Sequence, residues 1–223
     1  MSAANLPQPA ASDSVRMIRL MGSVSLICGL LIVGTHIGTM EPIRRNQEFI
    51  TKETVSALLP GVDKQAVYSL VNGDLQPGAQ PNVPVLYAGF DKQGALIGVV
   101  IETSERGYAD TIKAMYAYSP DLQAITGFQV MELKETPGLG DKITKDPAFL
   151  DNFKKLDVTA GPDGKPAHPV VTVKHGTKKN PWEVDAISGA TISSRAVGRM
   201  LAKSTATMLP LVRKNLDRIR KGN

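Results

Sequence analysis

Cysteine and histidine are scarce in this chain, and their scarcity limits the metal chemistry that it can support. The 223 residues include one cysteine, Cys28, and three histidines, His36, His168 and His175. A single cysteine excludes a disulfide within the chain, and it excludes zinc and iron–sulfur sites built from this chain's cysteines alone. A histidine-rich metal site is disfavoured for the same reason. We therefore expect no metal site, and redox chemistry in this protein would need an organic cofactor.

Aromatic residues are also few. They make up 5% of the sequence, which disfavours a stacking platform for single-stranded nucleic acid. Hydrophobic residues make up 42% and charged residues 21%, a composition typical of neither a disordered chain nor a polytopic membrane protein. The length suits one medium domain with an appendage, or two small domains.

The positive charge is concentrated at the C-terminal end. The formal net charge is +5, whereas residues 195–223 alone sum to +7, so the other 194 residues sum to −2. The tail contains one acid, Asp217, and eight basic residues: Arg195, Arg199, Lys203, Arg213, Lys214, Arg218, Arg220 and Lys221. This pattern is typical of a solvated helix face, with contact to anionic lipid or an acidic partner as the alternative. Nucleic acid is disfavoured because no binding motif accompanies the charge.

One long stretch lacks charge altogether. Residues 20–40 form a 21-residue uncharged segment, which as a helix would span roughly 30 Å, the thickness of the bilayer hydrocarbon. A cleaved signal peptide fits poorly because the apolar run is long, and a lipoprotein signal fits poorly because Ile27 precedes Cys28. The sequence predicts a disordered segment over 1–16, a transmembrane anchor over 17–41 and a domain over 42–223 that ends in a basic helix. Arginines flank both ends of the span, so charge leaves its orientation open.

Turn signals divide the domain into helices and strands. A helix is expected over 44–59, followed by a turn-rich loop over 71–84. The remaining expected elements are strands over 83–90, 95–103, 111–118, 125–133 and 170–173, a helix over 146–156, and a last helix from Ser193 or Ser194 with a kink or break at Pro210. Strands grouped as hairpins predict an α+β fold, with an antiparallel sheet flanked by helices and preceded by a single N-terminal transmembrane helix.

Small and hydroxyl residues crowd the segment DAISGATISSRAV, residues 185–197, where a strand-like stretch meets the last helix. Gly189 and Ala190 allow close approach of a ligand, and the first amides of a helix favour a phosphate. The hydroxyls belong to Ser188, Thr191, Ser193 and Ser194. A helix cap with a tight packing contact explains the same residues, so both interpretations stay open. A phosphate loop is excluded because no lysine follows the glycines, and a nucleophile elbow because Ala186 replaces its first glycine.

A second segment, ETPGLGDK at residues 135–142, is rich in glycine and proline. Pro137 stiffens it, and Gly138 and Gly140 allow tight or positive-φ turns around Leu139. The segment predicts either a plain connection or a loop that lays backbone amides and one apolar side chain against a flat ligand.

The two segments in this order, some fifty residues apart and behind one apolar span, resemble the FMN-binding G subunit of the Rnf electron-transport complex. They are also similar to the C subunit of the sodium-pumping NADH:quinone oxidoreductase, although the chain length favours the Rnf family. The resemblance extends from about Val83 to Leu209 in addition to the span. One departure is the sequence RGYADT at 106–111, where relatives often carry GYGG, which puts ligand contacts by Ala109 and Asp110 in doubt.

The resemblance implies one FMN per chain, attached through its phosphate to the hydroxyl of Thr191 as a phosphoester. It also implies a separate flavin transferase that uses FAD and recognises Asp185. The cofactor-binding residues that it implies, besides Thr191, are Ser188, Gly189, Ala190, Ser193, Glu135, Thr136, Gly138, Leu139 and Gly140. The hydroxyl at a helix start suits a phosphodiester, since the amides there already point at it.

The implied function is that of one component of an ion-translocating oxidoreductase, which relays electrons between neighbouring subunits and catalyses nothing alone. The implied location is a bacterial inner membrane, with the domain on the extracytoplasmic side. Three alternatives remain: the quinone-reductase relative, a flavin-dependent membrane regulator, and an anchored binding or assembly module without a cofactor.

Overall fold

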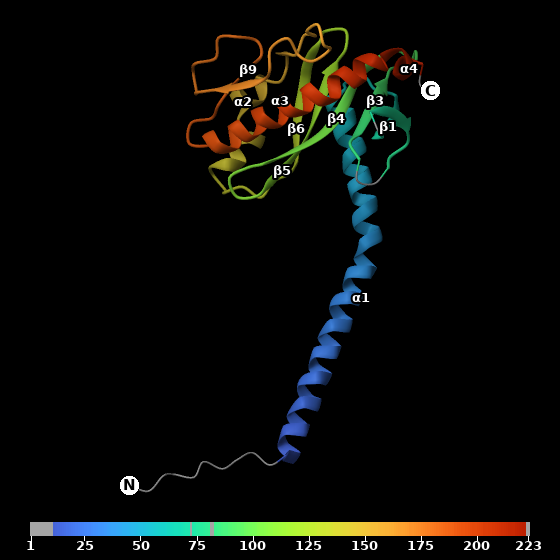
Figure 1. Ribbon diagram of the computed structural model, residues 1–223, viewed down its shortest axis with the longest axis vertical. Coiled ribbons are helices and arrows are strands. Elements are labelled where there is room, and N and C mark those ends of the chain that lie inside the picture. The colour runs from blue at the N-terminus through green and yellow to red at the C-terminus, as the bar shows by residue number, and fades with distance from the viewer. Residues whose placement is uncertain (1–10, 72, 81–82, 222–223) are drawn as a thin grey trace. The chain divides into compact units, whose positions relative to one another are not determined.

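The computed structural model describes residues 11–71, 73–80 and 83–221 (Figure 1). The chain divides into two compact units, residues 1–51 and 52–223. The disorder expected over 1–16 falls mostly on residues 1–10, which lie outside the described residues. From Ala11 onward the chain is helical, so the expectation is wrong for residues 11–16. That short stretch contains no proline or glycine to oppose a helix.

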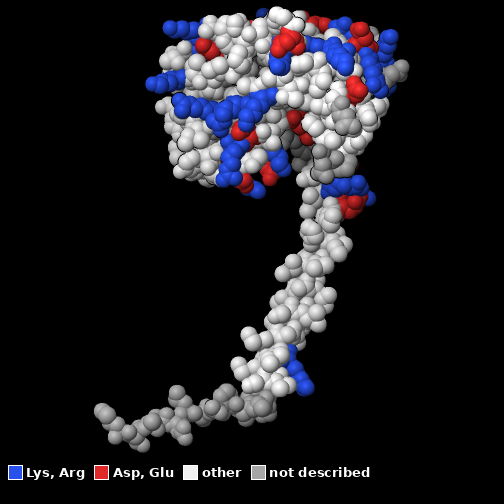
Figure 2. All heavy atoms as spheres, viewed as in Figure 1, with Lys and Arg blue, Asp and Glu red and all other residues white. Residues whose placement is uncertain are grey.

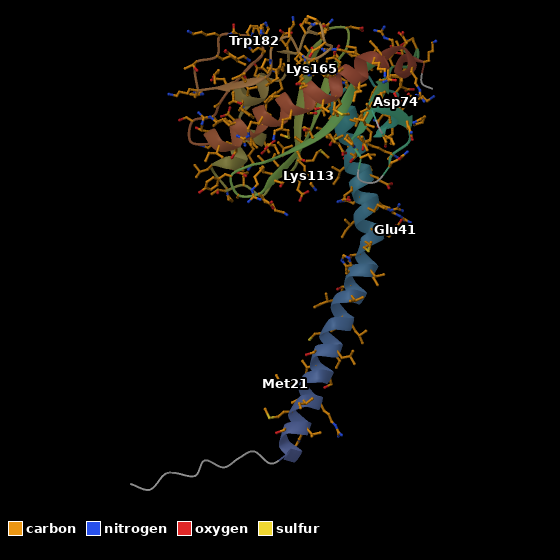
Figure 3. All side chains as sticks on the ribbon, viewed as in Figure 1. Met21, Glu41, Asp74, Lys113, Lys165 and Trp182 are labelled. Atoms are coloured by element: carbon orange, nitrogen blue, oxygen red, sulfur yellow. The ribbon has the colours of Figure 1, made fainter. Side chains whose placement is uncertain are left out.

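A single helix, α1 (Ala11–Leu58), contains the expected anchor. Its residues 14–58 include a window long and apolar enough to cross a bilayer, and no other helix in the described part of the chain does. Figure 2 shows the stretch of α1 without charged side chains, and Figure 3 labels Met21 near its beginning and Glu41 just beyond its end. Nearly every large apolar side chain of this stretch is exposed, including Leu26 and Leu30 at 65% each.

The helix predicted over 44–59 is not a separate element but the last part of α1. Pro42 lies inside α1 without ending it. A proline removes one backbone donor. Glu41 forms ion pairs one turn further on with Arg44 at 2.9 Å and Arg45 at 3.3 Å, which support the helix beyond the proline.

Seven antiparallel strands form the central sheet of the second unit, in the order β2-β1-β3-β4-β5-β6-β7, and two further strands pair in parallel as β8-β9. The strands are β1 (Lys64–Val71), β2 (Asp74–Pro77), β3 (Val85–Phe90), β4 (Leu96–Arg106), β5 (Thr111–Ser119), β6 (Ala124–Glu132), β7 (Leu156–Asp157), β8 (Val171–Val173) and β9 (Glu183–Asp185). The other elements are the 3₁₀ helix η1 (Gly140–Thr144) and the helices α2 (Pro147–Asp151), α3 (Thr191–Lys214) and α4 (Leu216–Arg220). The predicted α+β fold is confirmed, and β3–β4 and β5–β6 are the two predicted hairpins.

Three strands depart from the prediction. No element is predicted where β1 lies, and β2 lies inside the predicted loop 71–84. The predicted helix 146–156 shortens to α2, and its last residue, Leu156, begins β7. Turn-forming residues dominate 71–84, so the sequence indicates a loop there. The structure instead has a hairpin of β1 and β2, whose tight turn includes Gly73 at a φ of +84°.

Alternate residues of the central strands enter two different cores. Val99 and Ile101 of β4 belong to the larger core, to which α3 contributes, whereas Val100 between them packs with Val55 and Leu59 on the opposite face. This period of two is the side-chain alternation of a strand buried on both faces. α3 lies across the face of the sheet that carries the larger core (Figure 1). One end of this helix is therefore fixed against the sheet at the place where the candidate site begins.

Of the kink or break predicted at Pro210, the break does not occur, because α3 continues through the proline to Lys214. Leu209 and Val212 are fully buried on either side of the proline. Burial of such side chains contributes roughly 1.5–3 kcal/mol each, enough to offset the lost backbone hydrogen bond.

Much of the basic tail is bound within the domain. The guanidinium of Arg213 donates to the carbonyls of Val158 and Gly164 and to the Tyr118 hydroxyl. Four further basic side chains form ion pairs with acids of the sheet and its turns: Arg199 and Lys203 with Glu105, Lys214 with Asp74, and Arg220 with Asp121. These contacts favour a structural role for the tail over a lipid-binding one.

Candidate functional site

A pocket of about 440 Å³ opens where three segments meet that lie far apart in the sequence. The segments are the turn after β4, the loop between β6 and η1, and the start of α3. The lining residues are Tyr108, Glu135, Thr136, Leu139, Gly140, Gly189, Ala190, Thr191, Ile192 and Ser193.

Most of the predicted cofactor residues lie together in this pocket. Eight of the ten line it, and the two exceptions are Gly138 and Ser188. Gly138 has a φ of +76°, a conformation that shapes the loop and that glycine adopts without strain. Ser188 is exposed on the turn before α3. The structure thus brings the two predicted segments to one place, with Gly138 and Ser188 beside rather than in the pocket wall.

The first turn of α3 is open to a ligand. Gly189 takes a φ of +81°, and Ala190 precedes the helix without any side-chain cap. The first amides of a helix have no partner within the helix, and the positive end of its dipole lies there. No acidic residue occupies the first turn, and the Thr191 side chain is exposed at the pocket. These features suit a phosphate group.

The neighbouring hydroxyls test the capping interpretation of the segment. The Ser194 hydroxyl accepts the N–H of Ile187 at 3.1 Å and donates to the carbonyl of Ala190 at 2.9 Å, which fixes the turn. The Ser193 hydroxyl donates to Glu135 at 2.7 Å. Neither hydroxyl caps the helix, and no hydrogen bond within the described part of the chain engages the Thr191 hydroxyl. The capping interpretation is therefore wrong, although the packing contact that accompanied it is present.

Glu135 contacts the protein with both of its carboxylate oxygens. Its Oε1 accepts the backbone N–H groups of Tyr108 at 2.9 Å and Ala109 at 3.1 Å, and its Oε2 accepts the Ser193 hydroxyl. The residue is only 8% exposed. It therefore joins the three segments of the pocket, while its backbone and side chain form part of the wall.

Exposed apolar side chains surround the pocket. Tyr108 is 65% exposed, Leu139 49% and Ile192 50%. Within the described part of residues 52–223 only two other large apolar side chains are exposed, Leu122 and Val171, and neither lines the pocket. Grouping of exposed apolar side chains in one place indicates a binding surface. An apolar rim around hydroxyl and amide donors suits a ligand with a flat apolar part and a polar part.

Two of these rim residues are absent from the predicted site. Tyr108 lies in the sequence RGYADT, where the glycines typical of relatives are missing. Because of this departure, the sequence does not indicate a ligand contact by Tyr108. Ile192 lies away from the apolar face of α3 that Val197 and Leu201 define. An apolar residue off the buried face of a helix is the signal that would have identified it.

Asp185 lies outside the pocket lining. Its carboxylate accepts the N–H of Gly176 with both oxygens, at 2.8 and 3.0 Å, and it holds the loop between β8 and β9. His175 lies beside it, with Nδ1 3.0 Å from the Ala186 carbonyl. The side chain of Asp185 keeps 26% of its surface exposed. Asp185 thus has a structural contact in addition to any recognition by another protein.

Asp141 follows the pocket loop at the start of η1. The Lys145 ammonium, 2.9 Å from Asp141 Oδ2, holds the pKa of that carboxyl below its ordinary value. This ion pair fixes the first turn of η1 directly after Gly140, which lines the pocket.

The chain is similar to known proteins in both sequence and structure. Residues 107–205 match the FMN-binding domain family. The chain is 34% identical to the G subunit of the ion-translocating oxidoreductase complex of Methanosarcina acetivorans, over 84% of this chain and 90% of that one. It is 30% identical to the G subunit of the proton-translocating ferredoxin:NAD⁺ oxidoreductase complex of Clostridium ljungdahlii, over 77% and 78% of the two chains. In structure it is similar to NqrC of Shewanella oneidensis, with a TM-score of 0.57, 26% identity, and coverage of 76% of this chain and 88% of that one.

The fold and the pocket thus define an FMN-binding domain behind one helix able to span a membrane. The pocket residues fit the cofactor, because they combine an apolar rim with an uncapped helix start. The chain belongs to the family of G subunits of ion-translocating oxidoreductase complexes. Together with the apolar stretch of α1, this makes it a single-pass membrane protein.

Proposed function

We propose that this chain carries FMN, bound covalently through its phosphate to Thr191, and relays electrons between neighbouring subunits of an ion-translocating oxidoreductase complex. The observation that carries the proposal is the exposed Thr191 hydroxyl at an uncapped helix start, beside a pocket rimmed by exposed apolar side chains. Bound FMN supplies the group that accepts and gives up electrons, which no side chain of this sequence provides.

Each part of the pocket has a role in this proposal. The first amides of α3 bind the phosphate, and the absence of acids from that turn avoids repulsion. Leu139, Tyr108 and Ile192 cover the apolar ring system and exclude water from part of it. Both carboxylate oxygens of Glu135 accept hydrogen bonds from the chain, and these bonds hold the carboxylate in the pocket wall.

Attachment requires a separate flavin transferase with FAD as donor. The Thr191 oxygen forms a bond to the phosphorus of the FMN half, and the bond from that phosphorus to the bridging oxygen breaks. AMP leaves, and the hydroxyl proton passes to a base of the transferase. Exposure of Thr191 supports this step, because a second protein must reach the hydroxyl.

The test uses the full chain expressed with and without a flavin transferase. With the transferase, we expect a fluorescent band on a denaturing gel and a mass gain of one FMN less one water. Thr191→Val should abolish both. Thr207→Val is the matched control, since Thr207 is an exposed threonine of the same helix outside the pocket. A dark wild-type band would favour an anchored module without a cofactor, and fluorescence retained in Thr191→Val would move the attachment to another hydroxyl.

The proposed location has its own test. We propose that residues 52–223 lie on the extracytoplasmic side of the membrane, where covalent attachment prevents loss of the flavin. Protease added to intact spheroplasts should digest this part of the chain, and digestion that requires lysis would reverse the orientation.

A further inference from the structure

The pocket wall contains a buried carboxylate without a cationic partner in the described part of the chain. Glu135 is 8% exposed, and its three hydrogen-bond donors are two backbone amides and a hydroxyl. The described ion pairs of this region go instead to its neighbours, from Lys134 to Glu132 and Asp110. A buried charge needs hydrogen bonds or a counter-charge to offset its loss of solvation. For the Glu135 carboxylate, hydrogen bonds alone fill this role within the described part of the chain.

The backbone around Glu135 is shaped to admit this carboxylate. A Cβ atom added at Gly107 would collide with Oε1, and one added at Gly140 would lie 2.6 Å from Oε2 and 2.9 Å from Ser193 Oγ. Contacts this close essentially never occur at a Cβ atom. Two segments therefore have glycine at the places where they close on Glu135, which makes the carboxylate the centre of the local packing.

The contacts join segments that are remote in the sequence. Glu135 lies 27 residues from Tyr108 and 58 residues from Ser193. Tyr108 supplies the rim aromatic, and Ser193 lies in the first turn of α3 that begins with Thr191. Glu135 is thus one link between the rim and the helix start, beside Arg199, whose guanidinium donates to the carbonyl of Arg106.

From these contacts we infer that Glu135 is a positioning residue of the flavin pocket, and that its carboxylate places a negative charge in the wall of that pocket. The inference rests on the proposed function, because it assigns the pocket to the flavin. A negative charge beside a group that gains electrons disfavours the gain. The carboxylate therefore lowers the midpoint potential of this carrier, and the low dielectric of a partly closed pocket strengthens the effect.

The first experiment tests the positioning role without any flavin. The full chain, produced without a flavin transferase, is compared with Glu135→Ala and Glu135→Gln by amide hydrogen exchange. In Glu135→Ala, exchange at Tyr108 and Ala109 should be roughly tenfold to a hundredfold faster, the range expected for loss of hydrogen bonds to a charged acceptor. Glu135→Gln should restore most of the protection, since its amide oxygen accepts both N–H groups and its NH₂ faces Ser193 Oγ.

The second experiment tests the charge in the flavin-loaded protein. Glu135→Gln removes the charge with nearly the same shape, so the midpoint potential should shift to a more positive value. Glu132→Gln is the matched control, because Glu132 is a glutamate of the preceding strand, exposed and paired with Lys113 away from the pocket. Its potential should stay at the wild-type value.

The outcomes separate the inference from the proposed function. Unchanged exchange in Glu135→Ala would overturn the positioning role, whether or not flavin binds. A wild-type potential in Glu135→Gln, with protection retained, would overturn the role of the charge. A wild-type chain that takes up no flavin would sink the proposed function, while the exchange experiment would still decide the positioning role.

Discussion

Two regions of this molecule expose apolar side chains, and they do so in different ways. Along α1, from Leu20 to Met40, large apolar side chains are exposed at every turn, with no charge between Arg19 and Glu41. At the pocket the exposed large apolar side chains are those of Tyr108, Leu139 and Ile192, and the lining between them includes hydroxyls, amides and one buried carboxylate. The first region is apolar on all sides of a helix, whereas the second is an apolar rim around polar groups.

The difference shows what each region binds. A helix that is apolar on all sides has no single face to bury against a protein core. A bilayer accommodates such a helix, because its backbone amides are already hydrogen-bonded within the helix. A rim of three side chains from three separate segments has one geometry, which only a ligand of matching shape covers. Exposure alone is therefore a poor guide to function, and the polar groups beside the apolar ones distinguish a membrane anchor from a cofactor site.

Charged residues placed within the uncharged stretch of α1 should abolish its insertion into the membrane, the largest effect that we expect. We expect the double variant Leu26→Arg, Leu30→Arg to be lost from the membrane fraction, since each arginine near a span centre costs roughly 2.5–3.5 kcal/mol of insertion free energy. Phe49→Arg is the control, because Phe49 is as exposed but lies beyond the uncharged stretch. Membrane fractionation after an alkaline wash measures the effect, and retention of the double variant would contradict the anchor.

Two leucines sharpen the contrast between an exposed rim and a core. Leu201 is fully buried and Leu139 is 49% exposed. Leu201→Ala should lower the free energy of unfolding by roughly 2–5 kcal/mol, and Leu139→Ala by less than about 1 kcal/mol. The flavin absorbance should change in the opposite order, with the larger shift in Leu139→Ala. Denaturant unfolding and visible spectra measure both, and a large stability loss without a spectral change would make Leu139 a core residue.

Tyr108 offers a smaller effect with a specific optical signature. Tyr108→Leu keeps an apolar side chain at the rim but removes the aromatic ring, so flavin fluorescence should rise while unfolding free energy changes by no more than about 0.5 kcal/mol. Leu122→Ala alters an equally exposed side chain outside the pocket and should leave the fluorescence unchanged. If Tyr108→Leu fluoresces as the wild type does, the tyrosine does not contact the flavin.

The candidate site residues lie in two contiguous motifs, and their assignment to a cofactor comes from the family resemblance that these motifs carry. Thr191 and Leu139 lie in segments whose composition alone indicates tight turns at a helix start and in a loop. The central hairpins follow from alternating apolar residues between clear turns. The span follows from length and lack of charge. These signals are local preferences of short segments. Such preferences match the folded structure where tertiary packing does not override them.

Long-range contacts account for what could not be predicted. The partners of Glu135 lie 27 and 58 residues away, so its role as the joint of three segments has no local signal. The hairpin of β1 and β2 is concealed by turn residues, and β3 completes its pairing from beyond the loop. Pro210 is tolerated because buried leucine and valine flank it, which composition does not reveal. Packing therefore decides these features.

The smallest expected effect concerns acid and the ion pair beside the pocket. The pKa of Asp141 is lowered from 3.8 chiefly by the Lys145 ammonium. A carboxyl whose folded pKa is depressed adds stability above its unfolded pKa, and this contribution is lost as the pH falls through the folded pKa. Lys145 is 74% exposed, so the pair is weak and screened by salt.

Lys145→Ala should raise the Asp141 pKa toward 3.8 in an NMR titration, and the acid change of the flavin spectrum should begin at a slightly higher pH. Lys154→Ala, which breaks an exposed pair with Asp151 outside the pocket, should leave that onset in place. An equal shift in both variants would mean that general charge, rather than the η1 pair, governs the acid response of the pocket.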